Sequence, residues 1–202
     1  MTDPSAKAGA RAWARRAKNP YHAPMNLITE LPLRISDELV RAVVEVPRGS
    51  SLKLKYDGEL GVFVWSRALS AGVSFPYDYG FLPQTLSGDD GALDAVVLAE
   101  VGAYPGVVVP ARVIGALRLS QQREGQPRKR NDRILVVPAN EHRYAHVRSA
   151  SDLPERTREE LQAFFTASLL MTGKQVEFEG FAEAKEAQEL VAAGEARFRA
   201  TR

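Results

Sequence analysis

Apolar residues along most of this chain occur in short runs, some alternating with polar residues and some continuous. Runs of this length predict β-strands rather than helices. The predicted strands cover residues 42–46, 53–56, 60–65, 94–98, 107–119, 133–137 and 174–179. Turn residues such as Pro47 and Asp57-Gly58 separate the first of them. A polar stretch over residues 121–132 predicts a loop after the longest strand.

The last third of the chain changes to helical spacing. Leu161, Phe164, Phe165 and Leu169 recur three or four residues apart, which predicts an amphipathic helix. Residues 182–200 predict a second helix, with Leu190, Val191, Gly194 and Phe198 on one face. Many short strands followed by two helices favour an α+β, mainly β fold, in which an antiparallel barrel carries the helices outside.

Composition narrows the class of protein. The chain has 202 residues, 45% of them hydrophobic, which suits one domain with a substantial core. A formal net charge of +2 does not call for a nucleic-acid partner. The chain contains no cysteine, so disulfides and Cys-ligated zinc are excluded. No apolar run reaches the length of about 20 residues that spans a membrane, and we expect a cytoplasmic protein without a membrane partner.

The domain boundary is predicted near residue 24. Residues 1–24 read as a short basic extension, with Arg11, Arg15 and Arg16 in a segment of helical character that Asn19-Pro20 ends. Residues 25–202 hold all the predicted strands and both helices. We therefore expect a single folded domain over residues 25–202.

The densest group of chemically active residues lies between Phe75 and Asp94. This stretch holds several aromatic residues and then a turn with Asp89, Asp90 and Asp94, just before the apolar strand. Asp and Gly are favoured in turns for backbone reasons, so the aspartates could simply be solvated. Carboxylates gathered on one turn are also what Mg²⁺ accepts as ligands. The turn by itself leaves both interpretations open.

Motifs on both sides of the turn resemble those of the soluble, family I inorganic pyrophosphatases. The matching residues are Tyr79-Gly80-Phe81 with the acidic turn, Glu45-Val46-Pro47-Arg48-Gly49-Ser50 followed by Lys53, Arg67, Gly173-Lys174 and Glu179-Gly180-Phe181. The resemblance runs from about residue 31 to residue 198. It implies a five-stranded OB-like barrel, hydrolysis of diphosphate to two phosphates, Mg²⁺ or alternatively Mn²⁺ as cofactor, and a homo-oligomer, in bacteria a hexamer.

The resemblance also assigns site residues. The metal ligands would be Asp89, Asp94, Glu45, Asn131 and Asp132. Diphosphate would be bound by Lys53, Arg67, Tyr79 and Arg133, of which the first three would also serve catalysis. Asp90 would help to deprotonate the attacking water, because the family's own aspartate for that task falls on Gly91.

Other family positions are replaced as well. An acidic pair after the longest strand is Gln121-Gln122 here, a metal-binding aspartate is Asn131, and a glutamate is Lys55. The family's late Tyr-Lys pair falls on Ser168-Leu169. Amide oxygens can ligate Mg²⁺ but add no negative charge. These changes leave two main hypotheses: a diphosphatase of altered or reduced efficiency, and a non-catalytic relative that binds a phosphorylated ligand or a protein partner. A hydrolase for another phosphoanhydride is a third.

Overall fold

The structure is a computed structural model that describes residues 25–169 and 172–202; the predicted basic extension, residues 1–24, lies outside the described residues. Its strands are β1 (Leu39–Val46), β2 (Leu52–Asp57), β3 (Val62–Ala68), β4 (Asp78–Leu82), β5 (Leu93–Val97), β6 (Val108–Arg123), β7 (Lys129–Arg130), β8 (Arg133–Pro138) and β9 (Lys174–Glu183). The helices are η1 (Ala150–Asp152), α2 (Glu155–Leu169) and α3 (Ala184–Ala200). In the part of the chain that is described, no helix is long and apolar enough to cross a membrane.

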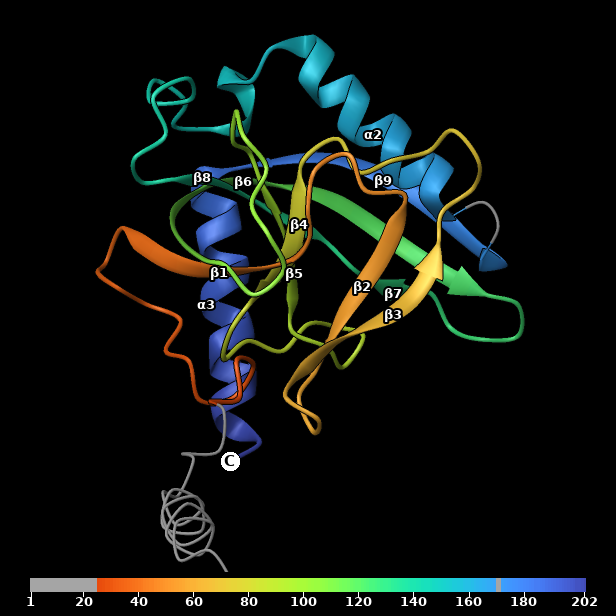
Figure 1. The fold of residues 1–202 in the computed structure, drawn as a ribbon, viewed down its shortest axis with the longest axis horizontal. Helices are drawn as coiled ribbons and strands as arrows, with labels where there is room; N and C mark the ends of the chain where they lie inside the picture. The colour runs from red at the N-terminus through yellow and green to blue at the C-terminus, as the bar shows by residue number, and fades with distance from the viewer. Residues whose placement is uncertain (1–24, 170–171) are drawn as a thin grey trace, which may run out of the picture.

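Five strands close into a ring. β1 pairs with β4, β4 with β5, β5 with β8, β8 with β6, and β6 returns to β1. The predicted mainly β fold with an OB-like barrel is confirmed, with one difference, because the β5–β8 pair is parallel. The long strand β6 runs between these two in sequence and carries the chain back across the ring, so β8 re-enters in the direction of β5 (Figure 1).

The ring is extended on one side and accompanied by a separate hairpin. The strand β9 pairs with β6 over most of its length, and the short β7 pairs with β6 at Ser120 and Gln121. β2 and β3 form their own two-stranded sheet beside the ring (Figure 1). These two additions matter because both edges border the groove described below.

Two of these elements differ from the prediction. β4 was not predicted, because Pro76 and Gly80 are turn-forming residues and the segment has no polar-apolar alternation. All five of its residues are buried. Gly80 is required there, since a Cβ would lie 1.8 Å from the carbonyl oxygen of Val43 on β1. The predicted loop over residues 121–132 is also partly wrong, because β6 continues to Arg123 and β7 pairs back on it.

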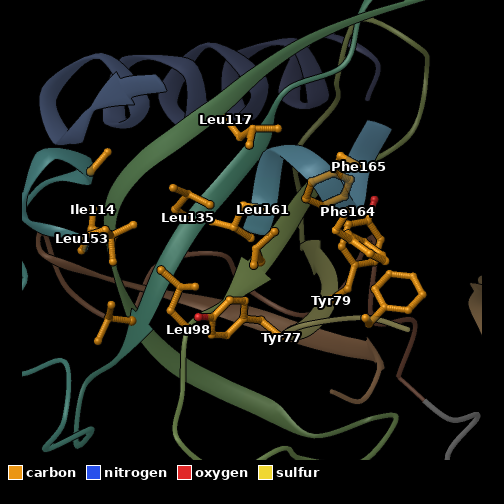
Figure 2. Packing of buried hydrophobic residues seen from close by; sticks show 14 of the residues in the cluster. Tyr77, Tyr79, Leu98, Ile114, Leu117, Leu135, Leu153, Leu161, Phe164 and Phe165 are labelled. Carbon is orange, nitrogen blue, oxygen red and sulfur yellow. The ribbon is translucent and has the colours of Figure 1, made fainter. Parts of the chain in front are cut away.

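Both predicted helices pack on the outside of the ring. Phe164 and Phe165 of α2 join Phe75 and Tyr79 in an aromatic cluster, with Phe75 and Phe164 ring centroids 4.8 Å apart (Figure 2). A second cluster contains Ala187 and Val191 of α3. Strand β8 contributes to both clusters through alternate residues, Leu135 and Val137 to the first and Ile134 and Val136 to the second. Burial on both faces explains its continuous apolar sequence.

Candidate active site

A groove of about 1070 Å³ lies at one edge of the ring, beside the β2–β3 hairpin. Twelve of its lining residues are acids and bases from seven different strands and two turns, so only the tertiary fold brings them together. The acidic residues are Glu45, Asp57, Glu59, Asp89, Asp90 and Asp94. The basic residues are Lys53, Lys55, Arg67, Arg123, Arg133 and Lys174. Gln121 and Asn131 line the same groove.

Arg133 is the buried cation at the centre of the groove. The parallel register of β5 and β8 places Asp94 directly opposite Arg133. The Arg133 side chain is 5% exposed, and its Nη1 lies 2.7 Å from Oδ2 of Asp94. Its guanidinium also lies over the ring of Phe165, 5.4 Å from the centroid. Asp94 therefore faces the groove already paired with a fixed positive charge.

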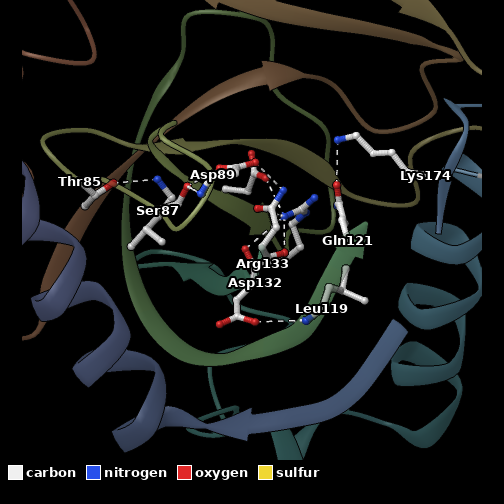
Figure 3. Close-up of polar contacts among 11 residues, drawn as sticks. Thr85, Ser87, Asp89, Leu119, Gln121, Asp132, Arg133 and Lys174 are labelled. Atoms are coloured by element: carbon white, nitrogen blue, oxygen red, sulfur yellow. Dashed lines mark hydrogen bonds and ion pairs between the residues drawn. The ribbon is translucent and has the colours of Figure 1, made fainter. Parts of the chain in front are cut away.

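Asn131 connects this ion pair to the acidic turn. Its amide oxygen accepts a hydrogen bond from Nη1 of Arg133, and its Nδ2 donates to Oδ2 of Asp89 at 2.9 Å (Figure 3). The other oxygen of Asp89 accepts from the hydroxyl of Ser87. An asparagine can serve both neighbours because it has an acceptor and a donor, whereas an aspartate would face Asp89 with a second negative charge.

Burial shifts the pKa values of Glu45 and Lys53 in the groove. Burial raises the pKa of Glu45 from 4.5 to about 7, and the neighbouring Asp94 adds to the rise, while the hydrogen bond from the Tyr56 amide opposes it. Burial lowers the pKa of Lys53, and Asp94 opposes that change. The Glu45 oxygen accepts the Tyr56 N–H at 2.7 Å. A carboxyl of this kind takes up a proton close to neutral pH.

Two pairs of like charges face each other across neighbouring strands. Lys53 lies opposite Arg67 in the β2–β3 pair, and Arg123 lies opposite Lys174 in the β6–β9 pair. Nζ of Lys174 donates to Oε1 of Gln121 at 2.9 Å. Like charges directly opposite destabilise a sheet, so both pairs suit an anionic ligand. The resemblance assigned Lys53 and Arg67 to the site but gave no site role to Arg123 or to the motif residue Lys174, because the proximity of these two depends on strand register.

Three predicted site residues do not point freely into the groove. The Asp132 carboxylate accepts from the backbone N–H of Leu119 at 3.2 Å and pairs with Arg130 at 2.8 Å, which turns it away from the groove (Figure 3). Tyr79 is 2% exposed, lies beneath Lys53 and Arg133, and does not line the groove. Asp90 lines the groove but is exposed and pairs with Lys129 at 3.3 Å.

The donor set fits fewer divalent ions than the resemblance implies. Asp89 and Asp94 offer the carboxylate oxygens that a hard divalent cation accepts. Within residues 25–169 and 172–202, however, no three His, Cys, Asp or Glu side chains lie close enough together to hold an ion. The neutral residues Gln121 and Asn131 stand where the resemblance places acidic residues of the family. The acids that remain to hold a divalent ion are therefore Asp89 and Asp94, and the described residues offer no cluster of acids for a centre with several ions.

Comparisons with known proteins agree with the motifs. The family described as Inorganic pyrophosphatase matches residues 42–199, which is most of the chain and holds every charged residue of the groove. This chain belongs to the inorganic pyrophosphatase family. An inorganic pyrophosphatase of Thermus thermophilus is 37% identical over 165 residues, covering 80% of this chain and 91% of that protein. Another from Leifsonia xyli is 37% identical over 153 residues, covering 75% and 91%.

Solved structures show the same fold. The crystal structure of the Thermus thermophilus inorganic pyrophosphatase superposes with a TM-score of 0.79 at 36% identity, covering 86% of this chain and 99% of that one. The Helicobacter pylori inorganic pyrophosphatase gives a TM-score of 0.76 at 26% identity, covering 84% and 98%. Family I pyrophosphatases depend on divalent metal ions.

Proposed function

We propose that this chain hydrolyses inorganic diphosphate to two phosphates with the help of a divalent cation, Mg²⁺ or Mn²⁺. The observation that carries the proposal is the convergence of Asp89 and Asp94 with Lys53, Arg67 and Arg133 in one groove of a pyrophosphatase-family fold. A divalent cation held by the two aspartates would neutralise phosphate oxygens and lower the pKa of an attacking water.

The remaining tasks fall to named side chains. Lys53 and Arg67 lie opposite each other and would bind one phosphate group through charge-assisted hydrogen bonds. Arg133 holds the Asp94 carboxylate in place through its 2.7 Å contact. Asp90 is an exposed carboxylate on the turn that lacks the family's usual base, and it would accept the water's proton. Asp90 is exposed and pairs with Lys129, so it is not held in place as a catalytic base. We therefore expect a slower enzyme, because a well-placed base contributes about 10²–10⁴-fold.

A second candidate function is a binding protein for phosphorylated ligands. The neutral Gln121 and Asn131 and the prepaired Asp94 favour it, because they reduce the capacity for metal and leave the cations in place. The two functions differ in turnover. A homo-hexamer, which the family resemblance implies, and a cytoplasmic location stay predictions.

Phosphate release from diphosphate by the purified protein, with Mg²⁺ or Mn²⁺ and in EDTA, tests the enzyme proposal. Lys53→Met should lower the metal-dependent rate at least about 100-fold while the protein stays folded, because the Lys53 ammonium has no hydrogen-bond or ion-pair partner in the described part of the chain. The matched control is Lys185→Met, an exposed lysine on α3. A wild-type rate with metal no higher than the rate in EDTA would rule out the enzyme and leave the binding protein.

A further inference from the structure

The end of the groove formed by β6 and β9 has an unusual balance of charge. In the pyrophosphatase family this region carries the acidic pair, whereas here it carries Gln121. Arg123 and Lys174 stand directly opposite each other, and Gln121 lies two residues before Arg123 on the same face of β6. None of the described residues forms an ion pair with Arg123 or Lys174. Two neighbouring cations without a carboxylate partner indicate that an anion completes this end of the groove.

Gln121 contributes to the same arrangement. A lysine ammonium can only donate hydrogen bonds, so the Gln121 oxygen faces Lys174, and the amide nitrogen is the group left over. That nitrogen is buried and has no hydrogen-bond partner among the described residues. An unmatched buried donor costs free energy unless a ligand or a local adjustment satisfies it. Gln121 thus orients Lys174 and adds a donor where a glutamate would add a negative charge.

The groove contains a second example of the same geometry. Lys53 and Arg67 also face each other across antiparallel strands, and they are the residues proposed above to hold one phosphate group. Both cation pairs line the same groove of about 1070 Å³. Burial lowers the pKa of Lys174 and the charge of Arg123 lowers it further, while the charges of Asp89 and Asp94 oppose the change. The two pairs therefore border the same central aspartates.

We propose that Arg123, Lys174 and Gln121 form a phosphate subsite that binds its anion directly, without a bridging divalent cation. The inference rests on the proposed function, because it assigns the second phosphate of diphosphate to this subsite and the first to Lys53 and Arg67. One divalent cation at Asp89 and Asp94 is then sufficient between them. The protein's own cations take over the charge neutralisation that additional metal ions would give.

Binding of imidodiphosphate, a diphosphate analogue with a nitrogen bridge, tests the subsite by titration calorimetry in EDTA. Wild-type protein should bind it without metal. Gln121→Glu should weaken this metal-free binding about 10-fold to 100-fold, because the new carboxylate pairs with Lys174 and repels the anion. Lys174→Met should weaken it to a similar extent. Gln122→Glu is the matched control, because Gln122 bonds the Gln126 carbonyl and Arg128 instead and does not line the groove.

The outcomes separate this inference from the proposed function. Absence of metal-free binding by the wild type overturns the subsite, as does equal binding by wild type, Gln121→Glu and Lys174→Met. An equal loss in Gln122→Glu also overturns it, because the effect would then be one of net charge. If phosphate release proceeds but metal-free binding is absent, the subsite fails and the enzyme stands. If metal-free binding occurs without phosphate release, the enzyme fails and the subsite stands.

Discussion

At the scale of single residues, Asn131 shows how one replacement changes the chemistry of the site. As an amide it joins Arg133 to Asp89, so the aspartates are satisfied without a metal ion. The family's aspartate at this position would put two carboxylates in hydrogen-bonding range of each other. One cation would then be needed to hold them together. The side chain at position 131 therefore decides how strongly the groove attracts a divalent ion.

This interpretation predicts that Asn131→Asp couples stability to metal. In EDTA the variant should lose about 1–3 kcal/mol in free energy of unfolding, because the donor to Asp89 is replaced by a like charge. Added Mn²⁺ should recover most of the loss, since a ligand that binds only the folded state stabilises it. Thermal unfolding with and without Mn²⁺ measures both effects. Asn140→Asp, at an exposed residue, is the control, and an identical response of the two variants would contradict the interpretation.

We expect Glu45 to make the stability of the fold depend on pH. Its pKa rises from 4.5 to about 7 on folding, so the native state keeps the proton that the unfolded chain releases between these values. The resulting stability is fully present below pH 4.5 and is lost as pH rises through about 7. The amplitude for such a buried group is roughly 3 kcal/mol.

We expect Glu45→Gln to remove this pH dependence. Its amide oxygen keeps the hydrogen bond from the Tyr56 N–H, and it cannot lose a proton. Urea unfolding in EDTA between pH 5 and pH 8 should show a smaller fall in stability than in wild type, and a more stable variant at pH 8. Glu189→Gln, an exposed change on α3, should behave like wild type. Parallel curves for wild type and Glu45→Gln would refute the role of Glu45.

At the scale of elements, the site depends on how closely strands approach. β4 lies between β1 and β5, which carry Glu45 and Asp94, and Gly80 permits the close contact with β1. A Cβ at Gly80 would meet three backbone atoms of β1 within 3.0 Å, and backbone atoms in a ladder cannot move separately. The glycine of the Tyr79-Gly80-Phe81 motif is therefore a packing requirement and not a ligand contact.

Gly80→Ala should consequently destabilise the protein by more than about 3 kcal/mol, or prevent folding. Gly91→Ala is the matched control, because the nearest atom to its Cβ would lie 3.6 Å away, an ordinary contact. Expression level and the urea midpoint measure the difference. An unchanged midpoint for Gly80→Ala would show that β1 and β4 can separate at this point without loss.

At the scale of the whole molecule, the closed ring explains why distant segments share one groove. Each neighbour pair fixes the relative position of two segments, and closure through β1 and β6 fixes all five strands at once. The β2–β3 hairpin and β9 then add one cation pair each at the borders of the groove. A single acidic turn thus faces cations that arrive from opposite ends of the sequence.

Much of this architecture was predictable from the sequence. Hydrophobic spacing predicted seven of the strands and both helices, because burial on one or both faces leaves a periodic trace in the chain. The motifs around Glu45, Tyr79 and Asp94 predicted the family. β4 was missed, because a segment that is buried along its whole length, with Pro76 just before it and Gly80 inside it, has no such period. The extension of β6 past residue 120 was missed because its residues are polar.

The site was predictable in part, for the same kind of reason. The identities of Asp89, Asp94, Lys53, Arg67 and Arg133 follow from motifs, and all five line the groove. The direction of a side chain does not follow from its motif: Asp132 turns to the Leu119 amide because that buried N–H needs an acceptor.

The sequence by itself determined which residue types are available and which local elements they form. The strand register, which only the tertiary structure decided, set Arg133 against Asp94 and Arg123 against Lys174. Register depends on contacts between segments far apart in the chain, whereas residue type and local spacing do not.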